Sequence, residues 1–430
     1  MKNFTNLPPK GTSDWMPEEF RVRKYIFDTW RKVCKSFGYQ EYLTPLVEYA
    51  EIYRAKSGED VGGKELTTFR DRGDRELAIR PEMTPSVTRM VSRIYENSPK
   101  PLRFFSIANF MRNEKPQKGR NREFWQLNCD IFGSDKLNSD IEVLQLALEI
   151  MRAFNAPKES YTFYINNRKL IDFVLDRIIK VETSTRVDLV RVLDKWNKLN
   201  EEDLVEIFKD LNLSGFQVEN LKLFMKSQNG VELLQNLPDI SESEGYKEIL
   251  KVESALRDMG YGANIVFNPS IIRGFDYYDG MIFEVYDNNP ENRRAMFGGG
   301  RYNGLASLFG SKSFPAVGFA PGDETTKIFL ENWNLVPNDL KVEEYYFPVL
   351  QEDFEQNNFL VKKLRSEGKN VIQGIEVQKV GKALEYANKI NCEFVVLFGE
   401  NERSRGVYII KDMKSGEQRE VEVNNEKIKN

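Results

Sequence analysis

The amino-acid sequence predicts an α+β protein that contains a helical insertion and ends in a small α/β domain. Three observations predict it. Strand candidates rich in aromatic residues surround a charged loop in the first part of the chain. From about residue 168 to 255, glycine nearly disappears and long helical periods take over. After Asn338, strand and helix patterns alternate, which is typical of a mostly parallel sheet.

The first elements follow from apolar spacing and from the residues that begin and end helices. Pro17 opens a helix over 17–37, whose apolar side chains recur at helical spacing, and Gly38 ends it. A strand over 39–43 stops before Pro45.

The later elements are read in the same way. We expect a hairpin over 66–81, a helix over 85–94, and strands over 102–110, 123–132, 263–267, 281–286 and 315–320. A helix over 138–154 is expected to be capped by Asn138 or Ser139. In the C-terminal part the expected elements cover 344–350, 353–367, 370–376, 379–391, 394–399 and 406–411.

The chain therefore divides into four expected parts. Residues 1–167 and 256–333 form one sheet domain, interrupted by the helical insertion 168–255, and residues 340–430 form the C-terminal domain. A chain of 430 residues is long enough for two or three domains.

Composition excludes several classes of protein. The 62 Lys and Arg residues against 66 Asp and Glu give a net charge of −4, so nucleic acid can be bound only through local basic patches. Three distant cysteines exclude a disulfide scaffold and fit a reducing compartment. Because the sequence shows neither a signal-peptide segment nor a run of 18 apolar residues, we expect a cytoplasmic protein without a membrane partner.

The sequence contains no histidine. This excludes catalysis by Ser-His-Asp or Cys-His arrangements and zinc sites with histidine ligands. Any chemistry must use carboxylates, arginines, tyrosines or a bound metal.

A basic segment at 112–126 is the strongest local signal. It contains five basic residues against two glutamates, with Pro116 and Gly119 marking a turn between two strands. Such a loop is either an ordinary solvated turn or a site that holds polyphosphate or an RNA end, because arginine presents a bidentate fork to phosphate. A second segment, Arg273 to Tyr278, places an arginine, an aspartate and two tyrosines where they can line a polar pocket.

In order along the chain, these segments resemble histidyl-tRNA synthetases, a family of class II aminoacyl-tRNA synthetases. The matching segments are Pro9 to Asp14, Gly38 to Pro45 (motif 1), Arg80-Pro81-Glu82-x-Thr84, Phe110 to Gln126 (motif 2), Arg273 to Tyr278, Gly298 to Tyr302 and Pro315 to Glu324 (motif 3). The segment Arg-Gly-Phe-Asp-Tyr-Tyr resembles a signature that is nearly private to this family and its close paralogue.

The resemblance implies a fold, an activity and partners. The fold would be a six-stranded antiparallel sheet carrying the active site, with a helical insertion and a C-terminal anticodon-binding domain. The enzyme would be a histidine–tRNA ligase that activates L-histidine with ATP and Mg²⁺ and transfers it to the 3′ end of tRNA(His). It would act as a homodimer.

The resemblance also implies roles for individual residues. Arg112 and Arg273 would be catalytic and, with Glu114, would bind ATP. The histidine-binding residues would be Glu82, Thr84, Gln126, Asp130, Tyr277 and Tyr278. The tRNA acceptor end would meet Gln117, Lys118, Arg120 and Arg122. The family often has glutamate where Asp130 stands.

The sequence departs from the family at motif 3. That motif normally ends in an arginine that packs on the adenine and contacts the γ-phosphate, whereas Thr325 stands here. Arg293, Arg301 and Lys327 are the candidates to replace it by proximity in sequence.

Two alternatives remain open. One is a non-catalytic histidine-sensing paralogue of the type of the ATP phosphoribosyltransferase regulatory subunit, which lacks the anticodon-binding domain expected here. The other is a tRNA-binding protein that has lost activation, which Thr325 favours.

Overall fold

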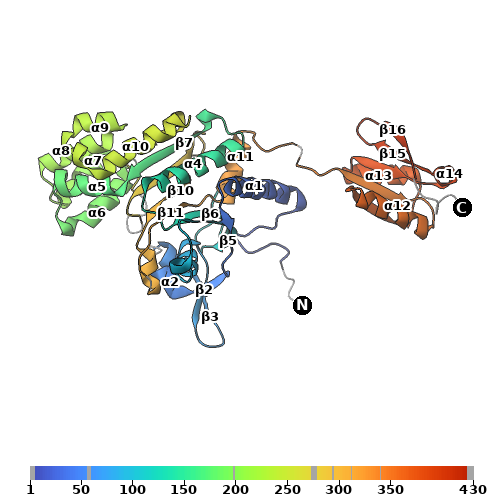
Figure 1. The fold of residues 1–430 in the computed structure, drawn as a ribbon, viewed down its shortest axis with the longest axis horizontal. Coiled ribbons are helices and arrows are strands. Elements are labelled where there is room, and N and C mark those ends of the chain that lie inside the picture. Colours follow the sequence, from blue (N-terminus) through green and yellow to red (C-terminus); the bar gives the residue numbers. More distant parts are fainter. Residues whose placement is uncertain are drawn as a thin grey trace. The chain divides into compact units, whose positions relative to one another are not determined.

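The computed structural model describes residues 5–55, 60–196, 199–272, 278–292, 295–310, 312–338 and 340–423. The chain forms two compact units, residues 1–336 and 337–430 (Figure 1). Among the described residues, no helix is both long enough and apolar enough to cross a membrane.

The first unit is built on an eight-stranded sheet in the order β1-β5-β6-β11-β10-β9-β7-β8. Its strands are β1 (Gln40–Glu41), β5 (Leu102–Met111), β6 (Glu123–Phe132), β7 (Tyr161–Asn167), β8 (Ile265–Phe267), β9 (Met281–Asp287), β10 (Ala295–Tyr302) and β11 (Ala316–Phe319). The strands from β5 to β7 in this order are antiparallel, as expected. These are the six expected antiparallel strands, and β1 and β8 add a parallel strand at each edge.

Helices cover the two faces of this sheet. α1 (Pro17–Ser36) and α4 (Leu137–Ala153) bury their apolar sides against Leu127, Cys129 and Ile131 of β6. α3 (Thr84–Ser92) packs on the opposite face with Ala108 and Phe110. Since side chains alternate along a strand, β6 presents its even-numbered residues to this second face.

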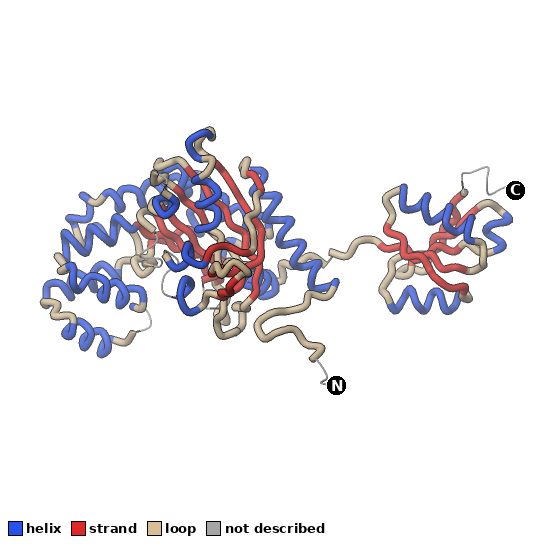
Figure 2. The backbone as a smooth tube through the Cα atoms, turned by 90° about the horizontal axis from the view of Figure 1, so that it is seen from below, coloured by secondary structure: helices blue, strands red, loops and turns tan. Residues whose placement is uncertain are grey.

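Smaller elements complete the first unit. A three-stranded sheet contains β2 (Val47–Tyr49), β3 (Thr67–Arg70) and β4 (Glu76–Ile79), beside α2 (Ala50–Arg54). The insertion contains α5 (Arg168–Phe173), α6 (Thr183–Asp194), α7 (Glu201–Asp210), α8 (Gly215–Lys226), α9 (Gly230–Asn236) and α10 (Glu244–Asp258). α11 (Asp323–Asn332) follows β11. Figure 2 shows the strands of the large sheet side by side, with helices around them.

The N-terminal cap expected for the helix over 138–154 is wrong. α4 begins at Leu137 after Lys136, and no side chain caps it. Ser139 instead donates a hydrogen bond from Oγ to Ser134 Oγ at 2.6 Å. The first turn of α4 carries Asp140, whose negative charge suits a helix N-terminus. Asp140 also pairs with Arg301.

The second unit is a five-stranded sheet in the order β13-β12-β14-β15-β16. Its elements are β12 (Glu344–Val349), α12 (Phe354–Ser366), β13 (Asn370–Val377), α13 (Val380–Lys389), β14 (Phe394–Leu397), α14 (Glu400–Ser404), β15 (Val407–Asp412) and β16 (Gln418–Glu422). The strands β13, β12 and β14 are parallel, whereas β15 and β16 run antiparallel to their neighbours. The sheet is therefore less parallel than the alternating pattern predicted.

Candidate active site

The face of β6 that carries its even-numbered residues forms the floor of the candidate site. Gln126 and Asp130 share this face because they are an even number of residues apart. Gly318 of β11 lies opposite Asp130, and Gly300 of β10 lies opposite Gly318. A Cβ atom on Gly318 would overlap Asp130 Oδ1, and one on Gly300 would lie 2.9 Å from Tyr278 Cδ1. These glycines therefore keep room above the sheet for both side chains.

Asp130 is a buried carboxylate on this floor. It is 4% exposed, and its Oδ1 accepts a hydrogen bond from the Tyr302 hydroxyl at 2.5 Å. Burial raises the pKa of Asp130 to about 7, while the bond from Tyr302 acts in the opposite direction. The sequence placed Tyr302 in a motif but did not identify it as a site residue. A signal was present, since Tyr302 and Gly300 are two residues apart and share a strand face.

The turn before α3 borders the floor. Arg80 is buried and donates hydrogen bonds to the carbonyl oxygens of Thr44 at 2.8 Å and Asn109 at 2.9 Å. These bonds fix the turn that carries Glu82 and Thr84, both half-buried at the start of the helix.

Arg112 lies between this turn and β6. Its Nε donates to Pro81 O at 3.1 Å, and its guanidinium carbon is 5.1 Å from the centroid of the Phe124 ring. Gln126 is held on the same side by a hydrogen bond from Nε2 to Ala320 O at 3.3 Å. The structure thus brings Glu82, Arg112 and Gln126 to one region, and their roles remain a prediction.

Residues 112–122 connect β5 to β6 and are called the basic loop below. Gln117 and Arg120 pair through their backbones around Gly119, whose φ of +76° suits glycine. Arg120 Nη1 lies 3.4 Å from Glu114 Oε2, and Arg122 Nε donates to Glu114 O at 3.1 Å. Gln117, Lys118 and Arg120 are exposed, so the loop presents polar and positively charged side chains to solvent.

At motif 3, the Thr325 hydroxyl folds back onto the backbone. Its Oγ1 donates to the carbonyl oxygens of Met296 at 3.0 Å or Gly322 at 3.1 Å. Arg301 cannot replace the missing arginine, because it is 6% exposed and pairs with Asp140 at 2.6 Å. That candidate is therefore wrong.

Lys327 is also engaged elsewhere. Its Nζ lies 3.0 Å from Glu19 Oε1 and 3.6 Å from Glu331 Oε1. These ion pairs direct its charge toward α1, so the structure does not support Lys327 as a substitute for the arginine. The third candidate, Arg293, lies outside the described residues.

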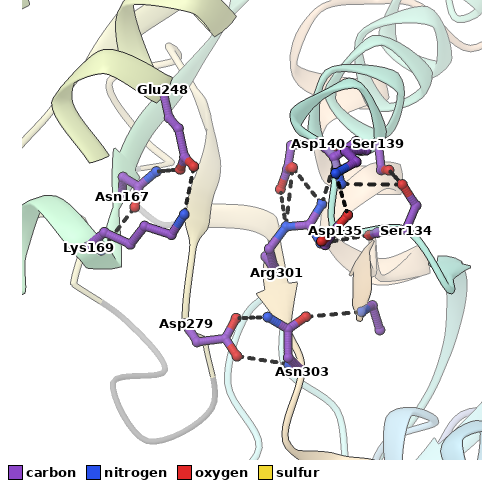
Figure 3. A network of polar contacts seen from close by, with 12 residues as sticks. Ser134, Asp135, Ser139, Asp140, Asn167, Lys169, Glu248, Asp279, Arg301 and Asn303 are labelled. Atoms are coloured by element: carbon purple, nitrogen blue, oxygen red, sulfur yellow. Dashed lines mark hydrogen bonds and ion pairs between the residues drawn. The ribbon is translucent and has the colours of Figure 1, made fainter. Parts of the chain in front are cut away.

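Arg273 and Tyr277 also lie outside the described residues, but the chain on either side of them is well fixed. Before them, Asn166 Nδ2 donates to Ile271 O at 3.0 Å. After them, Asp279 accepts hydrogen bonds from Asn303 N and Nδ2, each at 3.0 Å (Figure 3). Tyr278, which lies between Tyr277 and Asp279, packs among the apolar residues of the sheet.

Comparison with known proteins decides the family. A family model described as Histidyl-tRNA synthetase matches residues 11–323, and one described as Anticodon binding domain matches residues 348–427. The chain belongs to the histidyl-tRNA synthetase family.

Curated relatives match almost the whole chain. A protein named Histidine–tRNA ligase from Leptospira biflexa is 40% identical over 412 residues, covering 95% of this chain and 93% of that one. Another of the same name from Pyrococcus horikoshii is 35% identical over 429 residues, covering 98% of each.

Solved structures share the fold. Histidyl-tRNA synthetase from Nostoc superposes with a TM-score of 0.82 at 23% identity, covering 99% of both chains. A protein titled ATP phosphoribosyltransferase regulatory subunit/histidyl-tRNA synthetase from Bacillus halodurans superposes with a TM-score of 0.75 at 23% identity, covering 90% of this chain and 97% of that one. The chain therefore has the class II synthetase fold that the sequence predicts.

Proposed function

We propose that this chain is a histidine–tRNA ligase that activates L-histidine with ATP and transfers it to tRNA(His). The observation that carries this proposal is the pair of family matches, which together span residues 11–323 and 348–427. An anticodon-binding part is useful to a protein that charges tRNA, whereas a histidine sensor does not need one.

The chemistry suits a protein without histidine. The carboxylate of the substrate is ionised at neutral pH and attacks the α-phosphorus of ATP. A bond forms between carboxylate oxygen and phosphorus, and the bond to pyrophosphate breaks. No protein base is required, so catalysis consists of positioning and of neutralising phosphate charge. We assign Arg112 to the α-phosphate, with Arg273 on the other side and Glu114 beside the nucleotide.

The floor of the site is proposed to recognise the amino acid. Glu82, Thr84 and Gln126 would hold the α-ammonium group. Asp130 would accept a hydrogen bond from one ring N–H through Oδ2, since Tyr302 already donates to Oδ1. Tyr278, together with Tyr277, would contact the opposite side of the imidazole. An apolar analogue of similar shape would leave these buried polar groups without partners, which is a strong basis for rejection.

We propose that Mg²⁺ enters the site with ATP. Among the described residues, no three acidic or cysteine side chains gather as metal ligands. Mg²⁺ commonly takes most of its ligands from phosphate oxygens and water, and would neutralise charge on the pyrophosphate. Glu114 is the acidic residue of the basic loop, and its side chain is 13% exposed.

The basic loop is proposed to meet the acceptor end of the tRNA. Gln117, Lys118 and Arg120 are exposed, and Arg122 is half-buried at its base. Contacts from such side chains to phosphate would supply affinity, while few contacts to bases would supply specificity.

We also propose that the enzyme is a cytoplasmic homodimer. Leu43, Leu46 and Tyr49, close to motif 1, are 67%, 41% and 45% exposed. A second copy that packed on this region would remove these side chains from water. Sedimentation analysis should give about twice the mass of the chain, and Leu43→Asp should shift the protein toward monomer.

The deciding experiment measures exchange of labelled pyrophosphate into ATP without tRNA. Exchange that requires histidine, and that Arg273→Ala abolishes, would establish activation and show that Thr325 is tolerated. Histidine binding without exchange would point instead to a sensor or to a tRNA-binding protein that has lost activation.

A further inference from the structure

Arg23 in α1 pairs with two carboxylates at the start of α11. Its Nη1 lies 2.7 Å from Asp323 Oδ2, and its Nη2 lies 2.6 Å from Glu324 Oε1. The side chains of Arg23 and Asp323 are 1% and 0% exposed. The guanidinium carbon also lies 4.9 Å from the centroid of the Trp15 ring. Arg23, Asp323 and Glu324 are called the Arg23 cluster below.

Stability alone is a weak explanation for this cluster. Removing charges from water is costly, and apolar residues of similar volume often hold two elements together as well or better. Burial raises the pKa of Asp323 to about 6, against the effect of Arg23, so the carboxylate is costly to ionise. Within the described residues, Arg23 Nε also lacks a hydrogen-bond partner. The other contacts of the two carboxylates therefore indicate the functional role of the cluster.

Those contacts lead to the basic loop and to β6. Asp323 Oδ1 accepts a hydrogen bond from Trp125 N at 2.8 Å, directly before Gln126. Glu324 Oε1 accepts one from Asn121 Nδ2 at 3.0 Å, near the end of the basic loop. The next residue of the loop, Arg122, accepts a backbone hydrogen bond from Arg112 N at 2.8 Å.

We propose that Arg23 is a positioning residue for adenylate formation that acts through two separate connections. Through Asp323 it fixes the start of β6 beside Gln126, on the amino-acid side of the site. Through Glu324 and Asn121 it fixes the end of the basic loop beside Arg112, on the nucleotide side. This inference rests on the proposed function, and it links α1, which precedes motif 1, to motifs 2 and 3.

The two connections can be separated by mutation. Asn121→Ala breaks only the connection to the loop, so KM for ATP should rise on the order of tenfold while KM for histidine stays unchanged. Arg23→Met breaks both connections, so both KM values should rise and kcat should fall by up to about 100-fold. Arg23→Lys keeps the charge and should recover part of the loss. Steady-state pyrophosphate exchange measures all three variants.

A control removes an ion pair elsewhere whose side chains are partly exposed, at 33% for Arg103 and 24% for Glu142. Arg103 donates from Nε and Nη2 to the two carboxylate oxygens of Glu142 at 2.6 and 2.7 Å, away from the site face of the sheet. Arg103→Met should keep wild-type KM values for both substrates. An equal loss in this control would show a general loss of stability and would overturn the proposal.

Other results also test the positioning role of Arg23. Folded Arg23→Met and Asn121→Ala enzymes with wild-type KM values would refute the positioning role. If Arg23→Met does not fold, Asn121→Ala and Arg23→Lys carry the test. If the wild-type protein shows no histidine-dependent exchange, the proposed function fails. The connection to the loop is then tested by calorimetry with ATP. Weaker binding by Asn121→Ala than by the wild type would support the connection, and equal binding would refute it.

Discussion

At Asp130, burial of the carboxyl group opposes folding at neutral pH, whereas the proposed function uses this carboxyl group to recognise histidine. The pKa of this carboxyl is raised from an ordinary value of 3.8 to about 7. A raised acidic pKa means that the folded state binds the proton more tightly than the unfolded state does. The contribution of Asp130 to stability is therefore full below about pH 4 and is lost as pH rises toward 7. In the proposed function the carboxylate remains useful, because an ionised oxygen would accept a hydrogen bond from the imidazole N–H.

We therefore predict that Asp130→Asn gains stability and loses affinity. The advantage of asparagine should be small near pH 4 and should grow up to pH 7, by at most about 1.4 kcal/mol for each unit of pKa shift. Urea unfolding at pH 5 and pH 8 measures the gain, and calorimetry with histidine measures the loss. An advantage that shrinks with rising pH would contradict the assignment.

Gly318 should tolerate no side chain. A Cβ atom there would overlap Asp130 Oδ1 and would lie 2.5 Å from Cys129 O. Gly318→Ala should lower stability by about 1–3 kcal/mol, the usual cost of overpacking, and should abolish histidine-dependent exchange by displacing Asp130. Gly304→Ala is the control, because nothing lies within 4 Å of its added Cβ. Normal exchange by Gly318→Ala would place the histidine site elsewhere.

The candidate site residues that the sequence predicts belong to short motifs, whereas the candidates that it missed are partners across the fold. Arg112 and Gln126 stand out locally within a basic segment. The pairing of Arg23 with Asp323 joins residues 300 positions apart, and that of Tyr302 with Asp130 joins residues 172 positions apart. Such contacts depend on strand order and helix packing, which no local pattern contains.

At the scale of elements, β10 is fixed to the start of α4 by Arg301. Its guanidinium bonds to both oxygens of Asp140 and to the carbonyl oxygens of Ser134 and Lys136 (Figure 3). Arg301 O also accepts a hydrogen bond from Asp279 N, so the same residue fixes the chain that follows Tyr278.

Breaking this pair should be strongly destabilising. Arg301→Met leaves the Asp140 carboxylate buried without its partner, which typically costs about 3–5 kcal/mol. The double variant Arg301→Met with Asp140→Leu should recover much of this loss, because both charges are then absent. Denaturant unfolding of the wild type, of each single variant (Arg301→Met and Asp140→Leu) and of the double variant measures the coupling. Additive losses in the double variant would show that the two residues act independently.

The sequence predicted elements well where apolar periodicity was strong. The helix over 17–37 and the strands over 102–110 and 123–132 agree with α1, β5 and β6 within about one residue at each end. It missed β16, because four of its five residues are exposed and its pattern carries almost no apolar signal. Its pairing with β15 is set instead by the turn that contains Gly416, with φ of +76°.

At the scale of the whole molecule, each unit has its own apolar core. In the second unit, α12 packs on one side of the sheet around Phe347, and α13 packs on the other side around Tyr346. The proposed chemistry of activation lies entirely within the first unit, because its described residues Glu82, Arg112, Gln126 and Asp130 precede Val336. The division into four functional parts remains a prediction.

The two units should therefore separate activation from charging of tRNA. A chain that ends at Val336 should fold and should keep histidine-dependent pyrophosphate exchange close to the wild-type rate, since no proposed contact to histidine or ATP is removed. Aminoacylation should fall much further. Two linked binding units can raise affinity by about 100- to 10,000-fold over one, so kcat/KM for tRNA(His) should drop by at least about 100-fold. Adding the separate fragment 337–430 should not restore charging, because the link between the units is lost. Equal losses in exchange and charging would show instead that the second unit is needed to build the site for activation.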